Sequence, residues 1–299
     1  MNLRHLAIFH AIARRGSVNA AAEHLHTSQP AVSRELRTLE ERLGVVLFDR
    51  LPRGMRLTEA GQVLLDYADR IFTLDQAAER AMHELANLES GHLAIGASNT
   101  LGTYLLPALL AAFHTRYPGI ELSLEVTNTE HVVEGVRGMR YALGFVEGRV
   151  SDEAIAVHDF DQDRIVAVVA PEHPLAAVKK PGLHALAAAP AILREPGSGT
   201  REVVDEAFAR HGLSLRRGLE IGNSEAVKRM AMAGGGVGWI SELCVDEELR
   251  SGRLVALPTR ELELRRRLYW IGLHDRAPSR SVEALIAFWS ARAAARPAA

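Results

Sequence analysis

A pair of short helices joined by a tight turn lies near the start of this chain, and it limits what residues 1–58 can form. Apolar residues recur at helical spacing over residues 3–15. A short alanine-rich helix follows over residues 18–25, and a turn at residues 26–27 leads into a third helix over residues 28–44. Two helices separated by so short a turn are typical of a helix-turn-helix.

A hairpin pattern follows the third helix. Residues 45–50, VVLFDR, have the composition of a strand, and Pro52, Arg53 and Gly54 mark a turn before a second strand. A helix-turn-helix followed by such a hairpin is a winged helix-turn-helix. We therefore predict a mainly α-helical winged domain over residues 1–58.

The net charge of the chain, −2, conceals an uneven distribution. Residues 1–58 contain nine arginines and five acidic residues, which gives this segment a charge of +4 and leaves −6 for the remainder. A basic N-terminal segment on an acidic body is expected of a protein that binds a polyanion such as nucleic acid. A locally basic surface without a partner is the alternative that charge alone leaves open.

One long helix is predicted over residues 59–90, and Thr58 is placed to cap it. Its apolar residues recur in alternating steps of three and four, an average of about 3.5 that is typical of a coiled coil. The predicted seam consists of Val63/Leu64, Tyr67/Ala68, Ile71, Leu74, Ala78, Ala81, Leu85 and Leu88. The alternative is a helix that lies on its own domain, for which the period drifts toward about 3.6. The regular steps favour a linker helix that joins two copies of the chain as a homodimer.

Strand and helix patterns alternate twice over residues 91–299. Such alternation predicts α/β layers with largely parallel sheets. We assign lobe one to about residues 91–161 and 268–299, and lobe two to about residues 162–267. Two linked α/β lobes leave a cleft at the carboxyl ends of their strands, where small molecules bind.

The segment SVNAAAEHLHTSQPAVSRELRTLEERLGVVLFDRLPRGMRLTEAG, residues 17–61, resembles the DNA-binding signature of LysR-type transcriptional regulators along its whole length. The length of the chain, a boundary near residue 91 and the two-lobe pattern extend the resemblance to all 299 residues. It implies a two-lobe effector-binding domain similar to periplasmic-binding-protein folds, assembly into homotetramers, and transcription controlled by a small molecule. REPGSGTR and ALGFVEG resemble the branch that contains regulators of carbon fixation and of sulfur or nitrogen assimilation.

The helix after the turn of a helix-turn-helix enters the major groove and places its first residues on base edges. Here Gln29 can pair with adenine and Arg34 with guanine, while Arg37 is placed to meet phosphate. Arginines on the wing are placed to meet the backbone or a narrow minor groove. The predicted DNA-binding residues are Ser28, Gln29, Pro30, Ser33, Arg34, Arg37, Arg50, Arg53 and Arg56. The expected partner is double-stranded DNA with an interrupted inverted repeat, and RNA polymerase is a further candidate partner.

Two similar segments open helices in the two lobes. Ser98-Asn99-Thr100 follows the first strand of lobe one, and residues 197–201 follow a strand of lobe two. Hydroxyls, glycines and free N–H groups at a helix start form an anion site, although helix capping is the alternative for each segment. Their matched placement, together with the pocket positions that the LysR resemblance implies, favours a small anionic effector. The predicted effector-binding residues are Ser98, Asn99, Thr100, Phe145, Glu147, Ser198, Gly199, Thr200, Arg201 and Asn223.

Three of these residues also admit another role. Asn223 is a good helix cap, and Arg201 can be an exposed residue of a first helical turn. Glu147 would oppose an anion, so we expect it to pair with an arginine or to bind an amine or hydroxyl group of the effector.

Several classes of protein are excluded by what the sequence lacks. Its single cysteine, Cys244, leaves no intramolecular disulfide and no cysteine-cluster metal site, and GxSxG, HExxH and Walker signatures are absent. No apolar run approaches the ~18 residues of a membrane-spanning helix, and no secretory signal is recognisable. We therefore predict a cytoplasmic regulator that is not an enzyme and carries no metal or cofactor.

Two alternatives use parts of the same architecture. A solute-binding protein or a cleft enzyme can have the two-lobe fold, but it usually lacks an N-terminal winged module. An architectural nucleoid protein would bind DNA without needing the C-terminal cleft.

Overall fold

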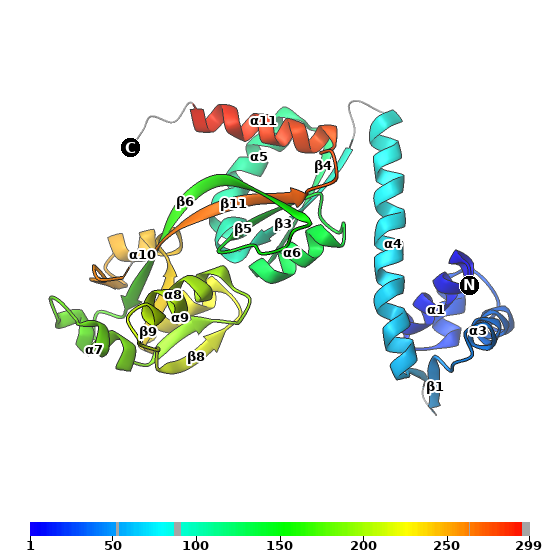
Figure 1. Ribbon diagram of the computed structural model, residues 1–299, viewed down its shortest axis with the longest axis horizontal. Helices are drawn as coiled ribbons and strands as arrows, with labels where there is room; N and C mark the ends of the chain where they lie inside the picture. Colours follow the sequence, from blue (N-terminus) through cyan, green and yellow to red (C-terminus); the bar gives the residue numbers. More distant parts are fainter. Residues whose placement is uncertain (52–53, 87–90, 263, 295–299) are drawn as a thin grey trace. The chain divides into compact units, whose positions relative to one another are not determined.

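The computed structural model describes residues 1–51, 54–86, 91–262 and 264–294. They form two compact units, Met1–Glu79 and Arg80–Ala299 (Figure 1). Within the described ranges, no helix combines the length and the apolarity that crossing a bilayer requires.

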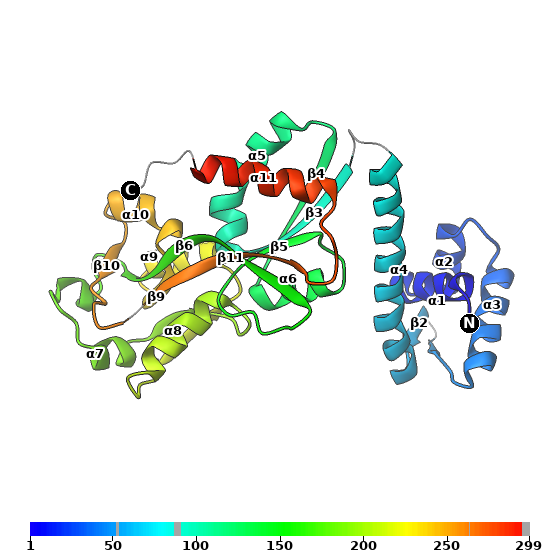
Figure 2. The ribbon, with the colours of Figure 1, turned by 45° about the horizontal axis from the view of Figure 1, so that its top comes forward.

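Three short helices build the N-terminal unit (Figure 2). They are α1 (Leu3–Arg15), α2 (Val18–His24) and α3 (Gln29–Leu43). The side chain of Asn2 caps α1, and Ser17 caps α2 by accepting from the Ala20 N–H. Gly16 and Gly44 adopt the left-handed conformation that ends α1 and α3. Local capping chemistry therefore explains why the predicted helices agree closely with the observed ones.

The hairpin after α3 is fixed against the end of α1. Its strands are β1 (Phe48–Leu51) and β2 (Gly54–Leu57), which pair antiparallel. The Met55 N–H donates to the Gly16 carbonyl oxygen, and a Cβ at Gly54 would come within 2.7 Å of the same oxygen. Val45 and Val46, which we predicted to begin the first strand, are exposed and lie before it.

The first turns of α4 (Glu59–Ala86) complete the core of the N-terminal unit. Thr58 caps the helix through a 3.0 Å hydrogen bond from a backbone N–H of its first turn. Leu65 and Ala68 are buried in this core, and Arg14 of α1 donates to both oxygens of Asp69. The boundary predicted between residues 58 and 59 therefore does not separate two packing units.

The predicted heptad seam does not lie on one face of α4. Leu64, Ala68 and Ile71 pack against the core of their own unit, as the alternative to a coiled coil required. The other apolar residues form what we call the exposed α4 face, which consists of Val63, Tyr67, Leu74 and Ala78. The regular spacing had led us to assign all these residues to one seam, but a helix of about 3.6 residues per turn places them on two different faces. The side chains of Ala81 and Leu85, and all of Leu88, lie outside the described residues.

Within the described residues, one nine-stranded sheet runs through both lobes of the second unit. Its strands are β3 (Gly91–Ser98), β4 (Ile120–Thr127), β5 (Leu143–Glu147), β6 (Ile155–Val169), β7 (Ala191–Arg194), β8 (Arg217–Ile221), β9 (Val237–Ser241), β10 (Val255–Leu257) and β11 (Arg265–Leu273). The order is β4-β3-β5-β11-β6-β9-β7-β8, with β10 paired to β6. In lobe one β3 pairs parallel with β4 and β5, and in lobe two β7 pairs parallel with β8 and β9.

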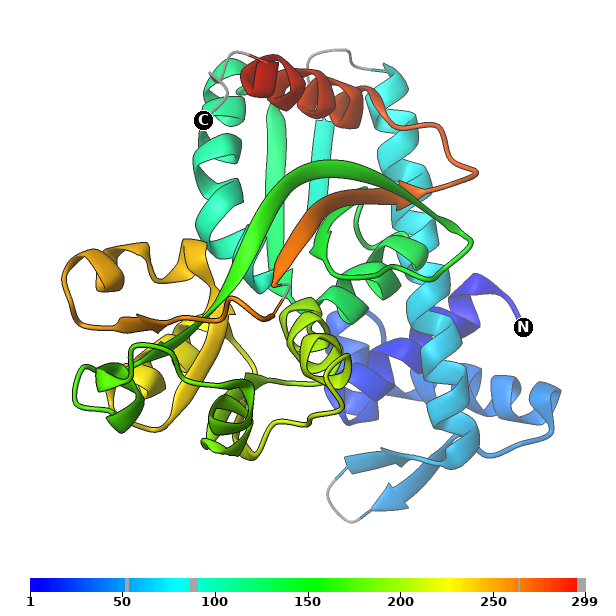
Figure 3. The same cartoon turned by 60° about the vertical axis from the view of Figure 1, so that its left-hand side comes forward.

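Two antiparallel strands, β6 and β11, run side by side from one lobe into the other and form the hinge (Figure 3). Their register joins Leu273 to Ile155 at one end and Arg265 to Arg164 at the other. β6 spans Ile155–Val169 and so passes from lobe one into lobe two. Its first half carries charged residues at alternate positions, which conceals a strand from a search for apolar runs.

Helices cover both faces of the sheet in each lobe. They are α5 (Leu106–Arg116), α6 (Thr129–Arg137), α7 (Leu183–Ala188), α8 (Gly199–Ala209), α9 (Ser224–Met232), α10 (Asp246–Arg250) and α11 (Arg280–Ala294), with short turns η1 (Leu101–Leu105), η2 (Pro174–Ala177) and η3 (Glu242–Cys244). In lobe one, α5 and α11 pack around Phe113 and Trp289, and α6 packs through Val132. In lobe two, α8 packs through Phe208 and α9 through Val227. Both lobes are therefore covered α/β layers whose strand ends meet at the hinge.

Candidate functional site

The ends of two strands in lobe one and the start of one helix in lobe two meet beside the hinge. Ser98 ends β3, Glu147 ends β5, and Thr200 lies in the first turn of α8. These three side chains belong to residues that are only 1–2% exposed. β11 crosses between the lobes here and contributes Arg266. The interlobe cluster consists of Ser98, Thr100, Glu147, Asp163, Thr200 and Arg266.

Arg266 connects the two lobes through its guanidinium group. Nη1 donates to Thr200 Oγ1 at 2.9 Å, and Nη2 donates to Thr100 Oγ1 at 3.2 Å. Thr100 precedes η1 in lobe one, whereas Thr200 opens α8 in lobe two. Because the Arg266 side chain is only 2% exposed, water hardly competes for these bonds, and they hold the lobes in one arrangement.

Two carboxylates balance the buried guanidinium. Arg266 Nε donates to Asp163 Oδ2 at 2.8 Å, and Nη1 lies 3.5 Å from Glu147 Oε1. Ser241 donates to the other Asp163 oxygen at 2.9 Å. Burial raises the pKa of the Glu147 carboxyl, although the positive charges of Arg266 and Arg194 oppose that rise. Glu147 therefore pairs with an arginine, as we predicted.

The backbone of the two lobes also meets beside Glu147. Its carbonyl oxygen accepts from Thr129 Oγ1 at 2.9 Å, and a Cβ at Gly199 would come within 2.0 Å of the same oxygen. The Glu130 N–H of lobe one donates to the Gly197 carbonyl oxygen of lobe two at 3.2 Å. Gly199 therefore permits a close approach that any larger residue would prevent.

A second buried arginine, Arg194, ends β7. Its Nη1 donates to Ser224 Oγ at 2.9 Å, and its Nε and Nη2 donate to the Glu195 carboxylate at 2.7 Å. Burial raises the pKa of Glu195, but the hydrogen bonds and charge of Arg194 outweigh burial and hold this pKa below its ordinary value. The charge of Arg194 is thus matched inside lobe two.

Two further predicted effector residues bond to backbone groups of other residues in their own lobes. Asn99 Nδ2 donates to the Thr127 carbonyl oxygen at 2.9 Å. Asn223 is exposed and caps α9, where its side chain accepts from the Ala226 N–H at 2.7 Å. Ser198 is buried at the N-cap position of α8 but makes no side-chain cap bond. Asn223 therefore performs the capping role that the sequence had left open.

Phe145 and Arg201 do not join the interlobe cluster. Phe145 packs with Phe160 and Trp289 in the core of lobe one, because its side chain points from β5 into the apolar layer. Arg201 is neither exposed nor turned toward the hinge. It donates to Asp205 at 2.6 Å and to the Arg194 carbonyl oxygen at 2.9 Å. The cation that reaches the hydroxyls of both lobes is Arg266 instead.

Sequence reasoning did not single out Arg266 or Asp163. Arg266 is the central member of the run Arg265-Arg266-Arg267, and strand alternation places it on the opposite face of β11 from its two neighbours. Arg266 is buried between two exposed arginines. An apolar pattern on both sides of a charged residue in a strand could have indicated a buried ion pair.

The predicted DNA-binding residues lie on α3 and the hairpin of the N-terminal unit. Ser28, Gln29, Pro30 and Arg34 are exposed, and Ser28 occupies the N-cap position of α3 without a side-chain cap bond. Ser33 accepts from Gln29 Nε2 at 3.1 Å.

Other arginines of this surface are held by acidic neighbours. Arg37 pairs with Glu41 at 2.9 Å, and Arg56 pairs with Asp49 at 3.0 Å across the hairpin. Arg53 and the side chain of Arg50 lie outside the described residues. The exposed start of α3 is therefore the part of this surface whose polar groups are the most available.

A metal site is not part of this arrangement. Across the ranges that the structure describes, no three His, Cys, Asp or Glu side chains converge in a way that could hold a metal ion. Cys244 is buried, and burial raises the pKa of its thiol to about 12, which makes it a poor nucleophile or ligand.

Two family descriptions match nearly the whole chain. Residues 3–62 match the "Bacterial regulatory helix-turn-helix protein, lysR family", and residues 86–294 match the "LysR substrate binding domain". The chain is also 34% identical over 290 residues to a "Probable RuBisCO transcriptional regulator" from Cyanidium caldarium, covering 94% of this chain and 90% of that protein.

Two solved structures resemble this fold. Full-length CbnR complexed with its target DNA has a TM-score of 0.74 and 26% identity, over 96% of this chain and 98% of that chain. The regulatory domain of CcmR from Synechocystis PCC6803, in complex with 2-PG, has a TM-score of 0.64 and 30% identity, over 70% of this chain and 100% of that chain.

Proposed function

The chain belongs to the LysR family of DNA-binding transcriptional regulators that respond to a small molecule, and from that premise we propose that its effector is a small anion bound at the interlobe cluster. The observation that carries this proposal is one guanidinium that donates to a threonine of each lobe. A ligand that contacts both threonines favours one arrangement of the lobes. It shifts that equilibrium only by the difference between its affinities for the two arrangements.

The donors of the cluster suit an anion. Thr200 Oγ1 accepts from Arg266, so its own proton remains available for a ligand oxygen. The first N–H groups of α8, which begins at Gly199, add partial positive charge. A proton on Glu147, favoured by its burial, removes a negative charge that would repel the ligand. A carboxylate, a phosphate or a sulfur oxyanion matches these donors, and the complex of the similar CcmR domain with 2-PG supports a small ligand in this fold.

The DNA-binding surface is proposed to be the exposed start of α3 together with the hairpin. Gln29 and Arg34 can each make bidentate contacts to a base edge in the major groove. Arg56 and the predicted Arg50 and Arg53 would meet the phosphate backbone beside it. The similarity to CbnR, solved with its target DNA, supports this placement.

Assembly is proposed to use the exposed α4 face. Val63, Tyr67 and Leu74 are 54%, 57% and 52% exposed, although they are large apolar residues. Pairing this face with a second copy would bury them and would carry two α3 helices to the two halves of an interrupted inverted repeat. We further propose homotetramers, contact with RNA polymerase, a cytoplasmic location and no enzymatic activity.

The effector proposal is tested by a thermal-shift screen of the full chain with small carboxylates, phosphates and sulfur oxyanions, 2-PG included. A compound that binds the folded state raises the melting temperature by mass action. Calorimetry then compares the chain with Thr200→Ala and with Thr115→Ala, an equivalent change at an exposed threonine of α5. We expect Thr200→Ala to weaken binding roughly 10–150-fold, because a hydrogen bond to a charged group is lost, and Thr115→Ala to have no effect. Equal affinities of all three proteins would place the effector elsewhere.

A further inference from the structure

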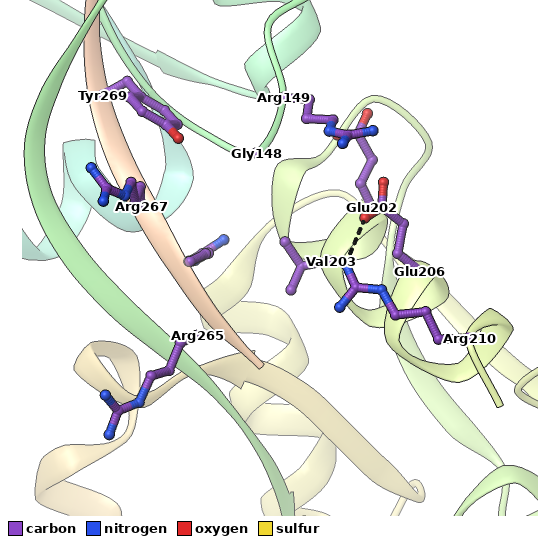
Figure 4. A pocket seen from close by; sticks show the side chains of 10 residues that line it. Gly148, Arg149, Glu202, Val203, Glu206, Arg210, Arg265, Arg267 and Tyr269 are labelled. Carbon is purple, nitrogen blue, oxygen red and sulfur yellow. Dashed lines mark ion pairs between the residues drawn. The ribbon is translucent and has the colours of Figure 1, made fainter. Parts of the chain in front are cut away.

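A cavity lies beside the hinge, between β11 and α8 (Figure 4). It has a volume of about 310 Å³, and the loop after β5 forms one edge of it at Gly148 and Arg149. Four exposed arginines from three segments line it: Arg149, Arg210, Arg265 and Arg267. Two carboxylates of α8, Glu202 and Glu206, lie on the opposite wall from β11.

This cavity adjoins the interlobe cluster at Arg266, which also lines it, but its other lining residues are different. Side chains alternate along β11, so Arg265, Arg267 and Tyr269 share one face of the strand and Arg266 points to the other. Arg265 and Arg267 are exposed, whereas the side chain of Arg266 is buried among Thr100, Thr200 and Asp163. A ligand in this cavity would therefore not take the place of an effector at the threonines.

The positive charge of the cavity is only partly matched by the protein. Arg267 pairs with Asp159 at 2.6 Å, and Arg210 has Glu206 at 3.6 Å. Among the residues that the structure describes, no hydrogen bond or ion pair holds Arg149 or Arg265. These two guanidinium groups therefore remain available to a ligand.

The carboxylates of the wall do not cancel this excess. Burial raises the pKa of Glu202, and the neighbouring charges of Glu206 and Glu130 raise it further. Tyr269 adds a phenol on the same face of β11 as the arginines, and in Figure 4 its hydroxyl points toward the cavity. The donors are planar guanidinium forks and one hydroxyl, which match the oxygens of a phosphate group.

We propose that this cavity is a second ligand site, for a small anion with at least two negative charges such as a phosphate or diphosphate group. Its arginines come from both lobes, since Arg149 follows β5 in lobe one and Arg210 follows α8 in lobe two. An anion between them stabilises the same arrangement of the lobes that Arg266 holds. Occupancy of this cavity and of the interlobe cluster are therefore coupled, and each ligand strengthens the other by the same factor. Only this coupling rests on the proposed effector site.

The test is calorimetry of the full chain with inorganic pyrophosphate at low ionic strength. The cavity variant combines Arg149→Gln with Arg265→Gln, and the matched control combines Arg217→Gln with Arg292→Gln, two exposed arginines away from the cavity. Both variants lose two surface charges, so non-specific attraction changes equally. We expect the cavity variant to bind pyrophosphate at least roughly tenfold more weakly than the control, because two charge-assisted contacts are lost.

Thr200→Ala separates this proposal from the effector proposal. It removes no contact to the cavity and only one hydrogen bond between the lobes. It should therefore weaken pyrophosphate binding much less than the cavity variant does, whatever it does to an effector. Equal pyrophosphate affinities of the cavity variant and the control would overturn the second site. So would the absence of pyrophosphate binding to the unmodified chain at millimolar concentration. Pyrophosphate binding that is lost in Thr200→Ala and kept in the cavity variant would assign the anion to the interlobe cluster alone.

Discussion

Replacing Arg266 by methionine tests the physical basis of the interlobe cluster. The substitution keeps much of the side-chain volume but leaves the buried carboxylates of Asp163 and Glu147, each with a side-chain exposure of 1%, without their guanidinium. Removing one partner of a buried ion pair costs about 3–5 kcal/mol, because the other charge is left uncompensated. For a unit of this size that loss lowers the melting temperature by roughly 6–20 °C.

The neighbouring residue supplies a matched control. Arg267 pairs with Asp159 at 2.6 Å, but the two side chains are 59% and 66% exposed. Such surface pairs contribute about 0–1 kcal/mol, so Arg267→Met should change the melting temperature by no more than about 4 °C. The predicted losses of stability on replacing these two adjacent arginines by methionine thus differ because only one of the two ion pairs is buried.

The destabilisation by Arg266→Met should grow with pH. Burial raises the pKa of Glu147 above its ordinary value of 4.5, and the loss of Arg266 removes a charge that opposes this rise. The folded state of the variant then binds more protons than its unfolded state. The contribution of the Glu147 proton to the free energy of unfolding is therefore fully present below pH 4.5, and it is lost as the pH rises through the pKa of Glu147 in the folded state. The assay is urea unfolding of the full chain at pH 5 and pH 8. Equal losses for Arg266→Met and Arg267→Met, or a loss at pH 5 that exceeds the loss at pH 8, would refute this reasoning.

Three further changes have definite expected outcomes. Gly199→Ala should weaken effector binding, because its Cβ would come within 2.0 Å of the Glu147 carbonyl oxygen. The control Gly222→Ala, whose Cβ has nothing within 4 Å, should leave effector binding unchanged. Calorimetry with an anion found in the thermal-shift screen measures both affinities. Arg34→Ala should relax sequence preference at one base position at a cost of ~1–3 kcal/mol, which a titration with base-substituted operators measures, and an unaltered preference would remove it from the groove. Leu74→Glu, on the exposed α4 face, should reduce the assembly seen by light scattering and lower operator affinity with it; an unchanged mass would contradict the pairing.

The winged domain could be predicted from the sequence because its signals are local. Gly16 and Gly44 end helices by their own conformation, and Ser17 and Thr58 cap helices within three residues. These signals do not depend on the rest of the fold. The same locality explains Arg201, whose partner Asp205 lies one helical turn away and is visible in the sequence as an i,i+4 pair.

The centre of the candidate site could not be predicted in the same way. Arg266 meets Asp163, Thr200 and Thr100 across 103, 66 and 166 residues of chain, and no local pattern encodes such contacts. Strand β10 and helix α7 have only three and six residues, which give too short a periodic signal to be predicted. The residues of the two apolar faces of α4 were predicted to form one seam, because the spacing of apolar residues does not show which neighbour each face of a helix packs against.

Control of DNA binding through the interlobe cluster is tested most directly by titrating the full chain with operator DNA, with and without the anion that the thermal-shift screen identifies. The comparison uses the unmodified chain and the double variant Thr100→Ala, Thr200→Ala. We predict that the anion changes the affinity or the footprint of the unmodified chain, and that this response is lost in the variant. DNA binding without the anion should be the same in both proteins, because neither threonine lies in the N-terminal unit. A response to the anion that survives both substitutions would contradict the account.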